Sequence, residues 1–377
     1  SSIWDVISGI INTTCPTLKD NAPKGLPQAS YIPSNILGFV ETARETTLGS
    51  LADEYEISVV TSILENLTEA MNKYGSIILS SGNNDHSSLD LLCSQLVDLL
   101  QGKHLCQSLD EALTALSKVL SVSEFSNIFT CLQNQIVALM SSGSRAKRAS
   151  VIGTVAEICM NLGTENPFLS VLLEHFINKL STDKSLEVRG YAAYGVGILV
   201  NNAQNVDVSP AYQPILKSLF EVMTVASEKS PDENTTQEVI DRCIANCSGC
   251  LARMILHNET LVPLSATIPP LLKQLPLKAG YEEYEPIFEV LLNLYGKNDP
   301  IILESSDLVC AALSNVFALD AERTKLSENT TIGRDLALEK MKQFTSDEMR
   351  AKIVSLVHFL KQKYPQLVAS HPSLSSL

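Results

Sequence analysis

The sequence has few basic side chains for its length. Its 377 residues include 28 Lys and Arg against 42 Asp and Glu, which gives a formal net charge of −14. Direct binding to nucleic acid is not expected, because contact with phosphates needs a basic face. An acidic surface favours encounters with basic partners through its long-range field, although an acidic excess can also serve only to keep a protein soluble.

Long apolar runs and paired cysteines are missing too. No uninterrupted apolar run reaches about 18 residues, so no helix is expected to insert into a membrane. No basic-then-apolar signal peptide stands at the N-terminus, and the nine cysteines lack the spacing of a disulfide framework. These absences predict reduced thiols in the cytosol or the nucleus. The first residue is Ser1 rather than Met, so the chain is expected to be a fragment of a longer protein.

Strand-like alternation is essentially absent, and aromatic residues make up only 6% of the chain. The abundant residues are Leu, Ala, Ser, Val and Ile, which suit helix-on-helix packing. Apolar residues recur at i, i+3, i+4 and i+7 over segments of about 12 to 22 residues. No composition shift or Gly/Ser/Pro-rich linker divides the chain. We therefore predict one all-α architecture over 1–377.

Short breaks join these segments into hairpins. Gly163 ends one helix and Asn166-Pro167 opens the next, while Asp299-Pro300 opens another. Second helices begin near residues 145, 187, 237 and 282, a spacing of about 40 to 50 residues that is typical of HEAT or armadillo repeats. The predicted helices are 34–55 with 57–74, 125–140 with 145–162, 168–180 with 188–201, 212–225 with 237–257, 261–275 with 282–295, and 300–319 followed by two more that end near 364.

Such hairpins bury their apolar faces against their neighbours. The fold class is therefore all-α, a HEAT-repeat solenoid in the form of a superhelical arch of about seven helical hairpins. An N-terminal docking segment is expected at 1–33 and a possible irregular insert at 82–120.

The segment 183–189 carries the local signature of a HEAT hairpin. An acid and then Val188-Arg189 precede a helix rich in small residues. Arg189 is expected to pair with an acid elsewhere in the stack, and Gly195 and Gly197 are expected to let helices approach closely. A glycine-rich nucleotide loop is the rival interpretation, but it would need a preceding strand, which the pattern lacks.

Three segments, in order and at the right spacing, resemble elements of the importin-β (karyopherin-β) nuclear transport receptors. They are RGYAAYGVG at 189–197, DRCIANCSGCLARMI at 241–255, and LPLK at 275–278 followed by YEE at 281–283. The segments GTVAE at 153–157 and EYEI at 54–57 also have counterparts there. One departure is Arg242, which stands where the family usually has Asn, while an Asn appears at Asn246.

The resemblance is strongest to the C-terminal half of the importin-four-like branch. It implies a monomeric fragment that binds basic cargo, such as histone H3 and H4 tails and ribosomal proteins. In the full-length receptor it implies Ran-GTP and phenylalanine–glycine nucleoporins as further partners, and shuttling between cytoplasm and nucleus through the nuclear pore. The repeats that hold Ran are expected to lie outside this chain. A HEAT-repeat scaffold of another kind, such as a phosphatase or coat-complex subunit, is the alternative.

The second helices of a HEAT solenoid line its concave face, where extended partners lie. Four polar residues on them are predicted to form a lysine-binding pocket: Tyr194, Asn246, Glu282 and Glu283. Carboxylates, an amide oxygen and an aromatic face suit an ammonium with its three donors. In the alternative interpretation Tyr194 packs, Asn246 caps inter-repeat carbonyls, and the glutamates favour a helix N-terminus.

A second acidic patch is predicted at Asp53, Glu54 and Glu56. These residues open a predicted helix, so helix capping is the other explanation for them.

Neither a metal site nor a catalytic centre is expected. Cys243, Cys247, Cys250 and His257 share one helical stripe, but the stripe is about 21 Å long at 1.5 Å rise per residue, too long for one tetrahedral ion. Small, soft cysteines commonly fill helix-packing faces, so buried structural thiols are predicted. No Ser-His-Asp, Walker or paired-carboxylate arrangement stands out, so we predict a protein that is not an enzyme and uses no cofactor or metal.

Overall fold

The computed structural model describes Thr114, Ser117 and residues 122–329 and 341–377. The predicted helices 34–55 and 57–74 and the segment 1–33 lie outside the described residues. So does 82–120, apart from Thr114 and Ser117. The chain divides into two compact units, Ser1–Pro167 and Phe168–Leu377, which are described separately.

The described part of the first unit is one hairpin, α6 (Val122–Met140) and α7 (Arg145–Leu162). The Ser144 side chain begins α7 by accepting a hydrogen bond from the Lys147 amide at 3.4 Å. Gly163 follows α7 with a φ of 59°, a left-handed backbone that glycine adopts without strain. The two helices therefore match the predicted segments 125–140 and 145–162 closely.

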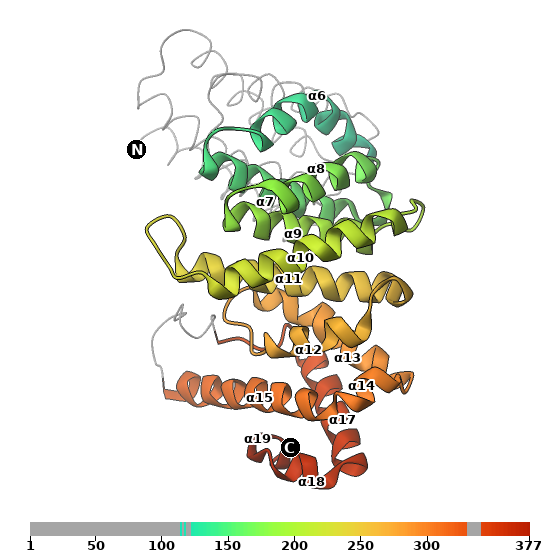
Figure 1. The fold of residues 1–377 in the computed structure, drawn as a ribbon, viewed down its shortest axis with the longest axis vertical. Helices are drawn as coiled ribbons and strands as arrows, with labels where there is room; N and C mark the ends of the chain where they lie inside the picture. The colour runs from blue at the N-terminus through green and yellow to red at the C-terminus, as the bar shows by residue number, and fades with distance from the viewer. Residues whose placement is uncertain (1–113, 115–116, 118–121, 330–340) are drawn as a thin grey trace, which may run out of the picture. The chain divides into compact units, whose positions relative to one another are not determined.

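The second unit contains three further hairpins and a C-terminal group of helices, stacked one after another (Figure 1). The hairpins are α8 (Leu169–Thr182) with α9 (Leu186–Asn201), α10 (Tyr212–Glu228) with α11 (Gln237–Asn258), and α12 (Leu264–Lys273) with α13 (Tyr284–Gly296). The first helices α8 and α10 contact each other, and the second helices α9, α11 and α13 form a separate row of contacts. This two-layer arrangement confirms the predicted all-α HEAT-type hairpins.

The C-terminal helices differ in part from the prediction. They are α14 (Pro300–Glu304), α15 (Ser306–Asn329), α17 (Asp347–Lys363), α18 (Pro365–Ala369) and α19 (Pro372–Ser375). The segment predicted as one helix over 300–319 is broken at Ser305, where the hydroxyls of Ser305 and Ser306 bond back to the carbonyls of Ile301 and Leu303. Such back-bonding by serine bends helices.

The predicted pairing of Arg189 is confirmed. Its Nη2 atom lies 3.1 Å from Glu221 Oε1 on α10, and its Nε donates to the Leu180 carbonyl at the end of α8 at 2.7 Å. One arginine at the start of α9 therefore ties together three consecutive helices of two hairpins.

The second helices α9 and α11 run parallel and in register. A Cβ atom built on Gly190 would lie 3.0 Å from Cys243 Cα, and one on Gly197 would lie 2.8 Å from Cys250 Cα. Since 190 and 197 are two helical turns apart, as are 243 and 250, the close approach persists along both helices. Gly195 instead faces the Phe176 ring of α8, at 2.5 Å from a built Cβ. The expectation that Gly195 and Gly197 permit close packing is confirmed.

The core of this unit is apolar and includes the predicted buried thiols. Cys243, Cys247 and Cys250 are all buried as free cysteines on the side of α11 that faces α9. These small side chains let α11 pack closely against α9.

The part of the chain that the structure describes has no helix long and apolar enough to cross a membrane.

Candidate functional site

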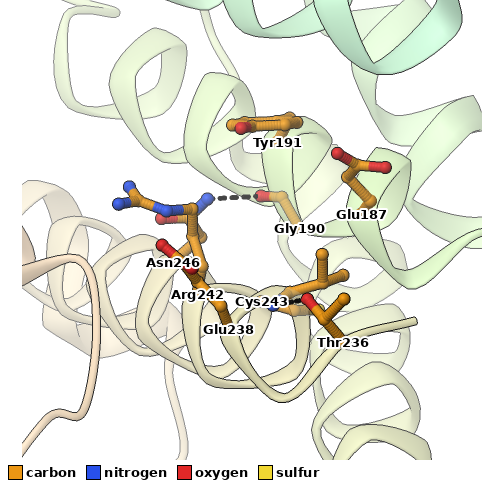
Figure 2. Close-up of a pocket in the computed structure, with 9 residues that line it drawn as sticks. Glu187, Gly190, Tyr191, Thr236, Glu238, Arg242, Cys243 and Asn246 are labelled. Carbon is orange, nitrogen blue, oxygen red and sulfur yellow. Dashed lines mark hydrogen bonds between the residues drawn. The ribbon is translucent and has the colours of Figure 1, made fainter. Parts of the chain in front are cut away.

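A pocket of about 210 Å³ lies between the first turns of α9 and α11 (Figure 2). Its polar side chains are Glu187, Tyr191, Thr236, Glu238, Arg242 and Asn246. The pocket opens on the row of second helices, the layer on which a partner was expected to lie.

Local helix geometry places these side chains. Ser185 begins α9, and Thr236 begins α11 by accepting a hydrogen bond from the Val239 amide at 3.3 Å. Glu187 and Tyr191 are four residues apart on α9, and positions 238, 242 and 246 follow the same interval on α11, so each set forms one stripe. Because α9 and α11 run parallel in register, the two stripes face each other across the pocket, as Figure 2 shows.

Asn246 lines the pocket and is itself almost fully buried. Its side-chain Nδ2 donates to the Gly190 carbonyl of α9 at 3.1 Å, and the residue is only 3% exposed. Within the part of the chain that the structure describes, its Oδ1 atom accepts no hydrogen bond. Asn246 therefore links two repeats through its amide nitrogen, while its Oδ1 atom lies near the segment before α13, 3.8 Å from a Cβ atom built on Gly280.

The rim of the pocket carries charges of both signs. Arg242 Nη1 lies 3.1 Å from Glu282 Oε1, with side-chain exposures of 38% and 46%. Burial raises the pKa of Tyr191 above its usual value, the Arg242 guanidinium opposes that shift, and the carboxylates of Glu187, Glu238 and Glu282 add to it. Three carboxylates and one guanidinium thus act on the same phenol, which leaves an excess of negative charge around it.

A second cluster of charge is buried deeper along α11. Arg253 Nη1 lies 2.5 Å from Glu283 Oε2, and Nη2 lies 3.2 Å from Oε1, so the pair is bidentate. The Arg253 guanidinium also lies over the Tyr194 ring, 5.5 Å from its centroid. Burial raises the pKa of Glu283, which is fully enclosed, and the adjacent Arg253 opposes that shift.

Gly249 makes room for this buried carboxylate. A Cβ atom built on Gly249 would overlap Glu283 Oε2. The absence of a side chain at 249 therefore lets the segment before α13 bring its carboxylate against α11, where Arg253 meets it one helical turn further on.

The four residues predicted to bind lysine thus fall into two groups around α11. Tyr194 and Glu283 are buried and face Arg253, a cation supplied by the chain itself. Asn246 lines the surface pocket, and Glu282 stands beside it through its pair with Arg242. A binding role for any of them stays a prediction. The patch predicted at Asp53, Glu54 and Glu56 lies outside the described residues.

Sequence reasoning missed Glu187, Tyr191 and Glu238 as pocket residues. The signal that could have found them is their four-residue spacing: Tyr191 is one turn after Glu187, and Glu238 lies two turns before Asn246 on the same stripe. Arg253 lies in the segment 241–255 that resembles the importin-β receptors, but nothing in the sequence indicated that it would pair with Glu283, 30 positions later.

The stripe of cysteines ends in a structural histidine. His257 Nδ1 lies 2.8 Å from the Tyr212 hydroxyl, and Nε2 lies 3.2 Å from the Ala203 carbonyl. Both ring nitrogens are therefore used to join α11 to α10 and to the loop that follows α9. Among the residues that the structure describes, no group of three or more His, Cys, Asp or Glu side chains is placed to hold a metal ion.

Comparisons with known proteins point to one group of relatives. A probable importin subunit beta-4 of Schizosaccharomyces pombe is 25% identical over 381 residues, which cover 94% of this chain and 32% of that protein. Importin-4 of Homo sapiens is 25% identical and importin-4 of Mus musculus 24% identical, each over 80% of this chain and 28% of the relative. The chain therefore spans about a third of the length of these relatives.

Other comparisons add little. No family model matches the chain. A solved engineered protein covers 89% of this chain, and 87% of its own chain is matched, at 15% identity and a TM-score of 0.32. That similarity is too low to bear on the fold.

Proposed function

Because the chain is an importin-4-like member of the importin-β family, we propose that it is part of a nuclear import receptor and binds basic cargo along its second helices. Histone H3 and H4 tails and ribosomal proteins are the cargo classes we propose. The chain acts as a binding surface and carries out no reaction. In the whole receptor, Ran-GTP and phenylalanine–glycine nucleoporins complete a cycle of shuttling between cytoplasm and nucleus.

The observation that carries this proposal is the acidic pocket between α9 and α11. A lysine ammonium has three donors and a full positive charge, so it needs acceptors of opposite charge that converge on one point. Glu187 and Glu238 line the pocket with carboxylates from the two facing stripes, Asn246 lines it with its amide, and Tyr191 lines it with an aromatic ring. An elongated lysine side chain fits a pocket of about 210 Å³.

The four residues predicted from the sequence take different parts in this proposal. Asn246 and Glu282 face the bound side chain. Tyr194 and Glu283 act through Arg253: by fixing this guanidinium between α9 and the segment before α13, they hold the neighbouring repeats in the register that forms the pocket.

One such pocket gives weak binding. Exposed ion pairs contribute only about 0–1 kcal/mol each, so a basic tail gains useful affinity by engaging several pockets at once. Asp53, Glu54 and Glu56 remain our proposal for a second acidic patch on the same chain.

The test is binding of a fluorescent lysine-rich histone H3 tail peptide, followed by anisotropy at low and moderate salt. Glu187→Gln combined with Glu238→Gln should weaken binding about 5- to 20-fold, because two facing carboxylates lose their charge while the side chains keep their size. The matched control is Glu259→Gln, compared with the single variants Glu187→Gln and Glu238→Gln. All three remove one carboxylate, but that of Glu259 pairs with Lys297 at the other end of α11.

The salt dependence of the affinity distinguishes binding in this pocket from non-specific attraction of a basic peptide to an acidic surface. Affinity should fall with ionic strength for the wild type and for Glu259→Gln, while the double variant should bind weakly throughout. Equal affinity of the wild type and the double variant at moderate salt would rule out this pocket as the lysine site.

A further inference from the structure

The pocket already contains a cation from the chain itself. Arg242 lies in the middle of the α11 stripe, one turn after Glu238 and one turn before Asn246, and its guanidinium lines the pocket. It reaches Glu282 in the segment before α13, which is 40 positions later in the sequence. The carboxylate that it engages is one that an incoming basic side chain would also seek.

We propose that Arg242 is an internal competitor for the basic side chain of the partner, and that binding requires its guanidinium to leave Glu282. This inference rests on the proposed function of the pocket. Arg242 thereby sets the affinity of the pocket and makes it selective for partners that engage several sites, because one lysine alone gains little by replacing one cation with another.

The geometry of the Arg242–Glu282 pair suits a contact that opens. It consists of a single hydrogen bond of 3.1 Å between half-exposed side chains. The Arg253–Glu283 pair on the same helix is bidentate, with side-chain exposures of 10% and 0%. An exposed ion pair with a single contact contributes little net free energy, because water can replace either partner. A buried bidentate pair stays closed, because opening it would leave a charge buried without a partner. Helix α11 therefore carries one fixed arginine and one that can be displaced.

Asn246 indicates where the incoming cation goes. Asn246 is almost fully buried, and its Oδ1 atom has no hydrogen-bond donor within the described part of the chain. Arg242, one turn away, donates to Glu282. Asn246 Oδ1 and Glu282 Oε1 each lie 3.8 Å from a Cβ atom built on Gly280, so an ammonium at this acceptor would also lie near the carboxylate that Arg242 engages. It would also be repelled by Arg242, because the two charges would lie within one Debye length of each other.

The test is the affinity of the wild type, Arg242→Met and Arg242→Gln for the same H3 tail peptide. Removing the resident charge should strengthen binding about three- to tenfold at low salt, and the gain should shrink as salt is added. The control is Lys297→Met, which removes the same charge from the exposed Lys297–Glu259 pair at the far end of α11 and should leave affinity unchanged within about twofold. Circular dichroism checks that each variant is folded.

Each result is decisive for a different claim. If either Arg242 variant binds as the wild type does, or more weakly, Arg242 is not a competitor and the inference is wrong, even where weakened binding of the Glu187 and Glu238 variants supports the pocket. If those carboxylate variants bind as well as the wild type, the proposed function of the pocket fails, and the inference fails with it. Equal strengthening by Lys297→Met would show a general charge effect and would also overturn the inference.

Discussion

Arg253→Met is the substitution that tests the packing around α11 most sharply. Methionine retains much of the apolar stem of arginine but removes the guanidinium that contacts both oxygens of Glu283. The carboxyl of Glu283 is fully buried, so water does not replace the lost donors. The Tyr194 ring loses its cation at the same time.

The expected cost follows from burial. Removing one partner of a buried ion pair destabilises a protein by about 3–5 kcal/mol, because the other charge is left uncompensated. The lower half of that range is expected here, since Glu283 can take up a proton and avoid the buried charge. Combining Arg253→Met with Glu283→Leu should recover most of the loss, because an apolar pair of similar volume costs little.

The assay is urea unfolding of the wild type, both single variants and the double variant, with hydrogen exchange of α11 amides to assign the loss to the second unit. The double-mutant cycle should give a coupling energy of about 2–4 kcal/mol. A loss below about 1 kcal/mol in Arg253→Met, or simple additivity in the double variant, would refute the claim that this pair is desolvated and holds the repeats together.

The pH dependence of the same variant has a defined sign. In Arg253→Met the group that opposes the raised pKa of Glu283 is gone, so its folded-state pKa should rise further. A carboxyl whose folded pKa exceeds its unfolded value is favoured in its protonated form, and this contribution is lost as pH rises through the folded pKa. The gap in unfolding free energy between wild type and variant should therefore narrow as pH is lowered. A gap that widens on acidification would contradict this assignment.

Three further predictions concern packing, capping and thiols. Gly197→Ala should destabilise the protein by about 1–3 kcal/mol, because the new Cβ would press on the α11 backbone. Gly296→Ala is the control and should be neutral, because the space around Gly296 is open. Thermal melts of the two variants and the wild type measure the difference. Thr236→Ala should cost about 1 kcal/mol in urea unfolding, because it removes the cap of α11. Burial raises the pKa of Cys159 to about 12 and that of Cys310 to about 11, so native-state alkylation at pH 8 should leave both unmodified until urea is added, as read by peptide mass spectrometry.

The hairpins were predictable because their signals are local. Apolar periodicity and end signals such as Gly163 and Asp299-Pro300 fixed helix pairs to within a few residues, since a helix begins and ends according to its own caps. The break at Ser305 was missed because helical periodicity continues across it, and only the hydroxyl back-bonding of two adjacent serines separates α14 from α15.

The site was predictable only in part, because it depends on register between repeats. Of the residues predicted from the sequence, Asn246 lines the pocket on α11, and Glu282 lies in the turn before α13 and pairs with Arg242. It had no means of knowing that Arg253 would meet Glu283, because that contact depends on the space above Gly249 and on how α11 lies against the segment before α13. The four-residue spacing within a helix predicts which residues form a stripe. Which stripe on α9 faces which stripe on α11 depends on how the two helices pack in the folded protein.

The proposal that this acidic pocket holds a lysine side chain is tested most directly by zero-length carbodiimide crosslinking. The reagent joins an amine to a carboxylate only where the two are in contact, and mass spectrometry locates the bond. With an H3 tail peptide, amide bonds from a peptide lysine to Glu187, Glu238 or Glu282 are expected, and acetylation of that lysine should abolish them. Crosslinks confined to carboxylates away from α9, α11 and the segment before α13 would contradict the account.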